Sequence, residues 1–173
     1  EISACLVGSE MCIRDSIWAV RGTPLLVQIV FIYTGLAAAG IMHFSDITFA
    51  GVTIPGNLQA GILALGLHEG AYMAEIFRAG IMAVDKGQTE AAKALGMPPM
   101  MLMRHVVLPQ ALRLVIPPLV NTFIGFFKDT SLVLIIGIFD LLTAGKTAII
   151  EPAWQGFGVE VYVAVGAIYF VFC

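Results

Sequence analysis

Charged side chains are scarce in this 173-residue sequence: they make up 12% of it, against about 25% in an ordinary soluble domain. Hydrophobic residues make up 59%, and the mean hydropathy is +0.93. So few charges cannot cover the surface of a water-soluble globule, and this hydrophobicity excludes an intrinsically disordered chain. The composition therefore predicts an integral membrane protein.

Basic residues are not in excess either. Lysine and arginine number 9 against 12 aspartate and glutamate residues, which gives a net charge of −3 and argues against a nucleic-acid binder. The 3 cysteines are odd in number and include no Cys-x-x-Cys pair. We therefore expect neither a disulfide framework nor a zinc or other metal site.

Four apolar stretches approach the roughly 20 residues that a membrane-crossing helix needs. They cover residues 24–42, 58–77, 113–127 and 159–173. Residues 132–142 are apolar but too few to cross, and they fit either a surface or re-entrant helix or the end of a kinked third span. We therefore predict an all-α, multi-spanning bundle of membrane helices.

Both ends of the sequence lead us to expect a fragment of a longer membrane protein. The run 159–173 is shorter than a full crossing and stops among apolar residues. Residues 5–16, CLVGSEMCIRDS, fit neither a span nor an amphipathic helix, and they resemble the translation of a transposon-end adapter used for sequencing libraries. We expect residues 1–16 to be foreign to the protein and interpret 17–173 as its membrane domain.

Basic residues gather around a central polar stretch at about 79–112. Because cytoplasmic loops carry an excess of lysine and arginine, we expect this stretch to face the cytoplasm. Residues 43–57 and 132–158 would then face outward. Of the 9 basic residues, five lie in the central stretch or beside it: Arg78, Lys86, Lys93, Arg104 and Arg113.

The central stretch predicts two short helices that meet at a turn. The first ends at Gly96, a residue suited to a left-handed helix cap. Pro98 and Pro99 then break the chain, a second helix restarts at 100–107, and Leu108-Pro109 marks the transition to the next span. The leucines and methionines of this stretch indicate either a partner surface or packing against the chain's own spans.

The spacing of residues in this stretch resembles the EAA loop of ABC-importer permeases. Glu90-Ala91-Ala92 is followed after three intervening residues by Gly96, after nine more by Val106, and after one more by Leu108-Pro109. Val106 stands where that pattern usually has isoleucine. Further motifs narrow the resemblance to polar amino acid permeases of the histidine, glutamine and glutamate type, over residues 21–173. These motifs are RGTPLLVQ from Arg21, AYMAEIFR from Ala71, PQALR from Pro109, IPP from Ile116, Asn121, and KDTSL from Lys128.

This resemblance implies a type I ABC-importer permease fold with about four of the family's spans, in a multi-pass protein of the bacterial inner membrane. It implies that residues 17–173 form the permease domain and that the central loop couples it to a cytoplasmic ATPase dimer. A second permease subunit and an extracytoplasmic amino-acid-binding protein are the other implied partners. Whether the two permeases are identical, and which amino acid they carry, stays open.

The resemblance implies that the partner ATPase binds and hydrolyses ATP with Mg²⁺. We therefore expect this chain to bind no cofactor and to have no enzymatic activity. The residues carried over to the ATPase interface are Glu90, Ala91, Ala92, Gly96, Leu108 and Pro109. Gly145-Lys146-Thr147 resembles the end of a phosphate-binding loop, but the pattern needs a glycine where Asp140 stands. We therefore expect no nucleotide site there.

Ionisable residues in the second predicted span indicate a polar path. Such groups are costly inside a membrane, so they face the bundle interior or a water path. His68, Glu69 and Tyr72 fit two interpretations: they line the path of the amino acid, or they are hydrogen-bonded structural groups. Asn121 and Thr122 in the third span are further path candidates.

Glu75 and Arg78 lie nearer the cytoplasmic end of the second span, at the i, i+3 spacing that allows an ion pair. We interpret them as a structural or gating pair. A rival function remains, in which His68, Glu69 and Glu75 form the relay of a proton-coupled secondary transporter. Such a transporter would be expected to contain inverted repeats, which the sequence lacks. A membrane hydrolase fits less well, because neither an HExxH nor a GxSxG motif occurs.

Overall fold

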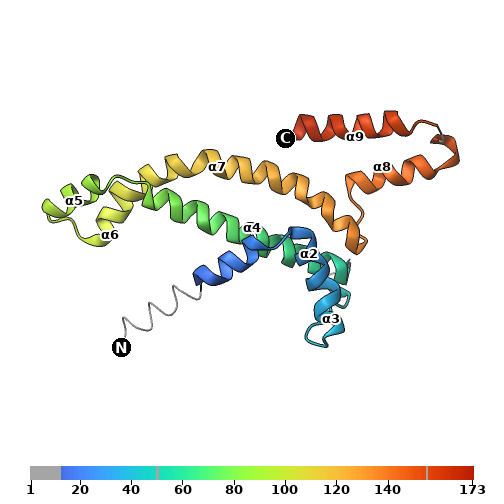
Figure 1. Ribbon diagram of the computed structural model, residues 1–173, viewed down its shortest axis with the longest axis horizontal. Helices are drawn as coiled ribbons and strands as arrows, with labels where there is room; N and C mark the ends of the chain where they lie inside the picture. Colours follow the sequence, from blue (N-terminus) through green and yellow to red (C-terminus); the bar gives the residue numbers. More distant parts are fainter. Residues whose placement is uncertain (1–12, 50, 155) are drawn as a thin grey trace. The chain divides into compact units, whose positions relative to one another are not determined.

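The computed structural model describes residues 13–49, 51–154 and 156–173 (Figure 1). Most of the segment predicted to be foreign, residues 1–12, lies outside this description, while residues 13–16 belong to the helix Ile13–Gly22. The described chain forms two compact units. One contains residues 13–21 and Glu69–Phe123, and the other contains Gly22–His68 and Ile124–Cys173.

The first predicted span, 24–42, is a shorter helix than expected. It comprises α2 (Leu25–Val30), a π-helical turn (Phe31–Gly35) and α3 (Leu36–Ala38). Pro24 is extended and therefore sets the beginning of α2. Gly40, with a φ of +69°, ends the helical run early because this left-handed conformation favours glycine.

A small hairpin follows where the sequence indicated only a polar loop. Strand β1 (Ile47–Phe49) pairs antiparallel with β2 (Val52–Ile54), and the two threonines Thr48 and Thr53 face each other at 3.3 Å between their hydroxyl oxygens. Gly51, with a φ of +82°, allows the tight turn between the strands. The Gly56 backbone N–H donates to the Asp46 carboxylate at 2.8 Å and so ties the hairpin to the next helix.

Helix α4 (Gly56–Met82) extends past Arg78, where the sequence predicted the second span to end. Its first half packs with α2 and the 3-10 helix Thr130–Ile136 in one core cluster. Asn57 strengthens this core, because its side-chain N–H donates to the Ile136 carbonyl at 3.1 Å. The buried members of the cluster are Leu25, Ile29, Ile32, Ala60, Ala64, Leu65, Val133 and Ile136.

The predicted pair of short helices is confirmed as α5 (Lys86–Ala94) and α6 (Pro99–Leu102). The predicted transition at Leu108-Pro109 coincides with the beginning of α7 at Leu108. It does not interrupt the chain's helix, which continues without a break from Pro99 to Ile136. This run passes from α6 through a π-helical turn (Met103–Val107) into α7 (Leu108–Asp129) and the 3-10 helix (Thr130–Ile136). Proline lacks a backbone N–H, so Pro109 cannot donate the usual helical hydrogen bond. The π-helical turn that ends at Val107 changes the hydrogen-bonding pattern just before this position, and the helix continues.

Residues 130–136 therefore extend the third span, and Gly137, with a φ of +77°, ends it. Helix α8 (Leu141–Ile150), a 3-10 turn (Pro152–Trp154) and α9 (Gly158–Phe172) follow. The two helices pack closely at Gly145, where an added Cβ would lie 2.9 Å from Val165 Cγ2. The Tyr169 hydroxyl donates to the Asp140 carboxylate at 3.3 Å and links the beginning of α8 to the end of α9.

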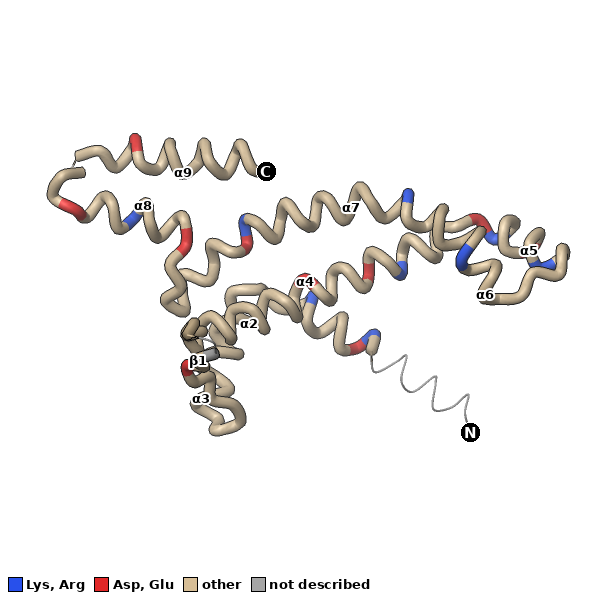
Figure 2. Tube along the Cα trace, turned by 180° about the vertical axis from the view of Figure 1, so that it is seen from behind, with Lys and Arg blue, Asp and Glu red and all other residues tan. Residues whose placement is uncertain are grey.

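In the part of the chain that the structure describes, Pro99–Ile136 is long and apolar enough to cross a membrane. A second span results if Ile13–Gly22 and Leu25–Ala38 are counted together, whereas α8 and α9 are shorter apolar helices. Helix α4 does not reach the same hydropathy among the described helices, because ionisable side chains interrupt it (Figure 2). The predicted all-α class is confirmed, with the β1–β2 hairpin as a small addition.

Candidate functional site

The segment that joins α4 to α7 begins with a capped helix. Asp85 is the N-cap of α5, and its carboxylate accepts a hydrogen bond from the Gly87 N–H at 2.8 Å. At the other end Gly96 has a φ of +74°, which confirms the left-handed cap expected from the sequence. The Met97 N–H donates to the Ala92 carbonyl at 3.1 Å and closes this cap. Local hydrogen bonds thus fix both ends of the first short helix.

One face of α5 packs against neighbouring helices of the same unit. Ala92 is only 5% exposed, and it belongs to a second core cluster with Val84, Leu102, Val107 and Ala111. Among the residues carried over to the ATPase interface, Ala92 therefore faces inward. Its small side chain allows α5 to approach α6 and the beginning of α7.

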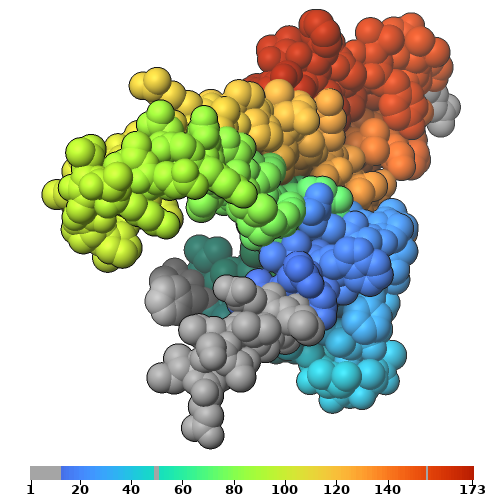
Figure 3. Space-filling view, turned by 60° about the vertical axis from the view of Figure 1, so that its left-hand side comes forward, coloured from blue at the N-terminus to red at the C-terminus, as the bar shows by residue number. Residues whose placement is uncertain are grey.

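The outer side of this segment exposes the other residues carried over to the interface. Glu90, Ala91, Gly96, Leu108 and Pro109 are all exposed. Large apolar side chains accompany them: Leu95 is 79% exposed and Met100 is 81% exposed. In the space-filling view α5 and α6, in yellow-green, form a protruding end of their unit (Figure 3). We name residues 86–107, from α5 through the π-helical turn, the coupling segment.

The predicted path residues of α4 are buried at its centre. His68 and Glu69 are each 8% exposed, which is unusual for ionisable side chains. Tyr72 is half-buried one turn further along α4. On α7, Asn121 is exposed and Thr122 is half-buried.

A glutamine that the sequence analysis gave no role contacts His68. The Gln28 Oε1 atom lies 3.2 Å from the His68 Nδ1 atom, and both residues belong to the same unit. The Gln28 Nε2 group also donates to Thr23, at 3.0 Å to its carbonyl and 2.7 Å to its hydroxyl. Gln28 lies in the RGTPLLVQ motif, but the pattern of the sequence alone does not show that it reaches a residue 40 positions away.

Charged residues follow along the second half of α4. Arg78 forms the expected ion pair with Glu75, in which the Arg78 Nε donates to one carboxylate oxygen at 2.9 Å and an Nη2 group donates to the other. The Arg21 guanidinium lies over the Tyr72 ring, 4.9 Å from its centroid, in a cation–π contact. The role of the Glu75–Arg78 pair stays a prediction.

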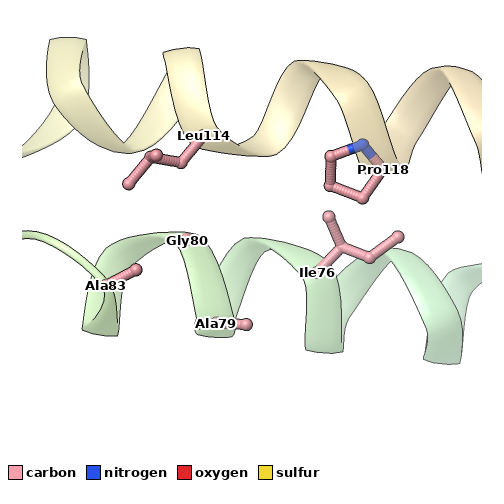
Figure 4. A pocket seen from close by; sticks show the side chains of 6 residues that line it. All are labelled: Ile76, Ala79, Gly80, Ala83, Leu114 and Pro118. Atoms are coloured by element: carbon pink, nitrogen blue, oxygen red, sulfur yellow. The ribbon is translucent and has the colours of Figure 1, made fainter.

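An apolar groove of about 350 Å³ lies between α4 and α7 in the same unit as the coupling segment. Leu114 and Pro118 point from α7 toward α4, and Ile76 points back toward them (Figure 4). The remaining lining comes from Ala79, Gly80 and Ala83. None of the predicted path residues lines this groove. Among the described residues, no group of three His, Cys, Asp or Glu side chains is arranged to hold a metal ion.

The described part of the chain holds one helix, or two if the bent pair is counted as one span, that is long and apolar enough to cross a membrane. Residues 10–173 match the family described as binding-protein-dependent transport system inner membrane component, and the chain belongs to that family.

Curated relatives and a solved structure are similar to the chain. It is 40% identical over 155 residues to the inner membrane amino-acid ABC transporter permease protein YhdY of Escherichia coli (strain K12), covering 86% of this chain and 42% of that protein. It is 46% identical over 124 residues to the arginine transport system permease protein ArgU of Corynebacterium glutamicum, covering 69% of this chain and 38% of that protein.

The solved structure is described as a crystal structure of an amino acid ABC transporter with histidines. It matches with a TM-score of 0.75 and 43% identity, over 92% of this chain and 67% of that one. The chain therefore spans less than half the length of the two curated relatives, while most of its own length matches them.

Proposed function

We propose that this chain is the membrane-spanning permease subunit of an ATP-driven ABC importer for polar amino acids. It would cross the bacterial cytoplasmic membrane several times. A cytoplasmic ATPase dimer, a second permease subunit of the same or a different sequence, and an extracytoplasmic amino-acid-binding protein would complete the importer. The chain would hold no cofactor, because ATP and Mg²⁺ belong to the ATPase. Family membership and the names of the relatives support this assignment.

The observation that carries the proposal is the exposed face of the coupling segment. Leu95 and Met100 are almost fully exposed, although burying apolar side chains stabilises a protein. Such a patch at the end of a unit is typical of a partner surface, and flexible methionines adapt to a groove. Glu90 adds a charged group to the same helix, while Ala91 and Gly96 leave room for a partner backbone to approach.

Packing inside the unit supports a mechanical link from this surface to the spans. Ala92 fastens α5 to the cluster with Leu102, Val107 and Ala111, so a displacement of α5 also displaces the beginning of α7. Gly80 brings α4 against α7, since an added Cβ would lie 2.1 Å from Val115 Cγ2. Closure of the ATPase dimer would therefore move α4 and α7 together with the coupling segment.

Burial of His68 and Glu69 supports a polar path along α4, and it also favours a second candidate function. Ionisable groups buried within a membrane helix serve proton relays as well as substrate paths. A proton-coupled amino acid transporter using His68 and Glu69 is therefore the alternative. It leaves the exposed coupling segment without a role.

The deciding experiment reconstitutes the full-length permease with its ATPase in lipid vesicles and adds the binding protein outside. We expect uptake of a radiolabelled polar amino acid to require both internal ATP and the binding protein. A proton uncoupler should leave uptake unchanged while ATP is held constant. Uptake driven by an imposed proton gradient without ATP would instead establish the secondary transporter.

A further inference from the structure

The apolar groove between α4 and α7 results from the small side chains on its α4 side. Ala79 and Ala83 present only methyl groups there, and Gly80 presents no side chain. Leu114 and Pro118 of α7 form the opposite wall (Figure 4). Ala79 and Ala83 are exposed, so the groove of about 350 Å³ is open to the surroundings of the protein.

The groove lies along a helix that can cross a membrane. Its α7 wall belongs to Pro99–Ile136, which is long and apolar enough to span, and the chain belongs to a family of inner membrane components. All of the lining side chains are apolar, so they offer water no hydrogen-bond partner. An empty groove would lose dispersion contacts along both walls. A hydrocarbon chain is the occupant that fits this lining.

Two basic residues lie where α4 and α7 meet the coupling segment. Lys86 begins α5, three positions after the groove residue Ala83, and Arg104 lies in the π-helical turn that leads into α7. Both are exposed, and neither forms an ion pair within the described part of the chain. The neighbouring acid, Asp85, accepts a hydrogen bond from the Gly87 N–H at 2.8 Å. Two positive charges against one negative charge leave this end of the unit positive (Figure 2).

We propose that the groove holds an acyl chain of an anionic phospholipid of the cytoplasmic leaflet, whose phosphate group lies at Lys86 and Arg104. Basic sites between membrane helices on the cytoplasmic side recognise such headgroups. The excess of lysine and arginine places the coupling segment on that side, so the headgroup and the basic residues belong to the same leaflet. The lipid is a ligand separate from the transported amino acid, and its binding does not depend on the proposed import.

A photoreactive lipid tests the occupant of the groove. The full-length permease is assembled with its ATPase in phosphatidylcholine nanodiscs that contain a little phosphatidylglycerol with a diazirine in one acyl chain. We expect the label on residues 79–83 and 114–118. Excess unlabelled phosphatidylglycerol should displace it, whereas inorganic phosphate should not. Because neither ATP nor an amino acid is present, failure of the importer assignment would not change this result.

A larger side chain in the groove tests its location. Ala83→Leu places three more carbon atoms where the acyl chain would lie. Each CH₂ group that loses its place lowers the affinity about fourfold, so loss of two should lower the labelling roughly tenfold. Ala74→Leu is the matched control, because Ala74 is also an exposed alanine of α4 but does not line the groove. It should leave the labelling unchanged.

Removal of the basic residues tests the choice of headgroup. In the double variant Lys86→Gln and Arg104→Gln, labelling by phosphatidylglycerol should fall to the level of phosphatidylcholine with the same diazirine. Lys93→Gln is the control, because Lys93 is a further exposed basic residue of α5 at the end opposite Lys86. It should keep the preference for phosphatidylglycerol.

Three results would overturn the proposal. Equal labelling of the unmodified permease by the two lipids would remove the choice by charge. Unchanged labelling in Ala83→Leu would place the acyl chain outside the groove. A photoreactive amino acid at position 79 that crosslinks to the second permease subunit, and not to lipid, would assign the groove to a protein contact.

Discussion

Close packing between α4 and α7 depends on the absence of a side chain at Gly80. An added Cβ would lie 2.1 Å from Val115 Cγ2 and 3.4 Å from the Ala111 carbonyl oxygen. We therefore expect Gly80→Ala to destabilise the permease by about 1–3 kcal/mol, because overpacking forces the helices apart. Thermal unfolding of the full-length protein in nanodiscs measures this loss as a lower Tm.

Gly66 on the same helix is the matched control. Among the described residues, nothing outside its own turn of helix lies within 4 Å of the position that its Cβ would take, and alanine favours helix over glycine. Gly66→Ala should therefore keep or raise the Tm. Equal decreases in the two variants would show that Gly80 does not set the distance between α4 and α7.

These glycines show how far single residues can be interpreted from sequence. Gly66 and Gly70 have the GxxxG spacing that predicts close helix packing, yet no other helix in the described part of the chain comes within 4 Å of either Cβ position. Gly80 is not part of a GxxxG pair in the sequence. The close approach at Gly80 depends on the partner helix α7, and a partner distant in the sequence cannot be inferred from local spacing.

The same limit applies to the candidate site. The i, i+3 spacing was sufficient to predict the Glu75–Arg78 ion pair, because both residues lie on one helix. The contact between Gln28 and His68 joins two helices and was not predictable from the pattern of either. Single-helix features of the site were thus accessible from sequence, and contacts between helices were not.

Among the elements, those governed by local signals were predicted best. Gly96 and the two prolines after it indicated the turn between α5 and α6, and the apolar run 159–173 became α9 with nearly the same bounds. The run 24–42 became only 14 helical residues, Leu25–Ala38, because Pro24 and Gly40 limit it. Hydropathy measures which residues avoid water, but it does not locate the backbone positions that end a helix.

The coupling segment can be tested at Gly96. A carboxylate there would lie on the exposed turn and would lose its hydration when a partner covers it, which is costly for a charge without a counterion. We expect Gly96→Asp to abolish ATP-coupled uptake while the protein still inserts into the membrane. Uptake by vesicles and the amount of membrane-inserted protein are the two measurements.

The variant Gly96→Asn distinguishes the effect of the added charge on uptake from the effect of the added side chain on the backbone. Asparagine tolerates the left-handed backbone and has nearly the shape of aspartate without its charge, so we expect it to retain much of the uptake. Normal uptake by Gly96→Asp would remove the coupling segment from the ATPase interface. Equal loss in both variants would assign the effect to the added side chain instead of its charge.

For the whole molecule, the arrangement of charge predicts an orientation in the membrane. Lys86, Lys93 and Arg104 lie in the coupling segment, whereas the described part of the stretch 43–57 contains no lysine or arginine (Figure 2). Because the excess of lysine and arginine lies on the cytoplasmic side, the coupling segment should face the ATPase and the β1–β2 hairpin should face outward.

Cysteine labelling tests this orientation directly. In a full-length protein without its native cysteines, Lys93→Cys on α5 and Thr53→Cys on β2 both place a thiol at an exposed position. We expect a membrane-impermeant maleimide added outside intact cells to label Thr53→Cys and to leave Lys93→Cys unlabelled until the cells are opened. Labelling of both variants in detergent shows that both thiols react. If both reacted from the same side in intact cells, α4 would not cross the membrane and the proposed path along it would be excluded.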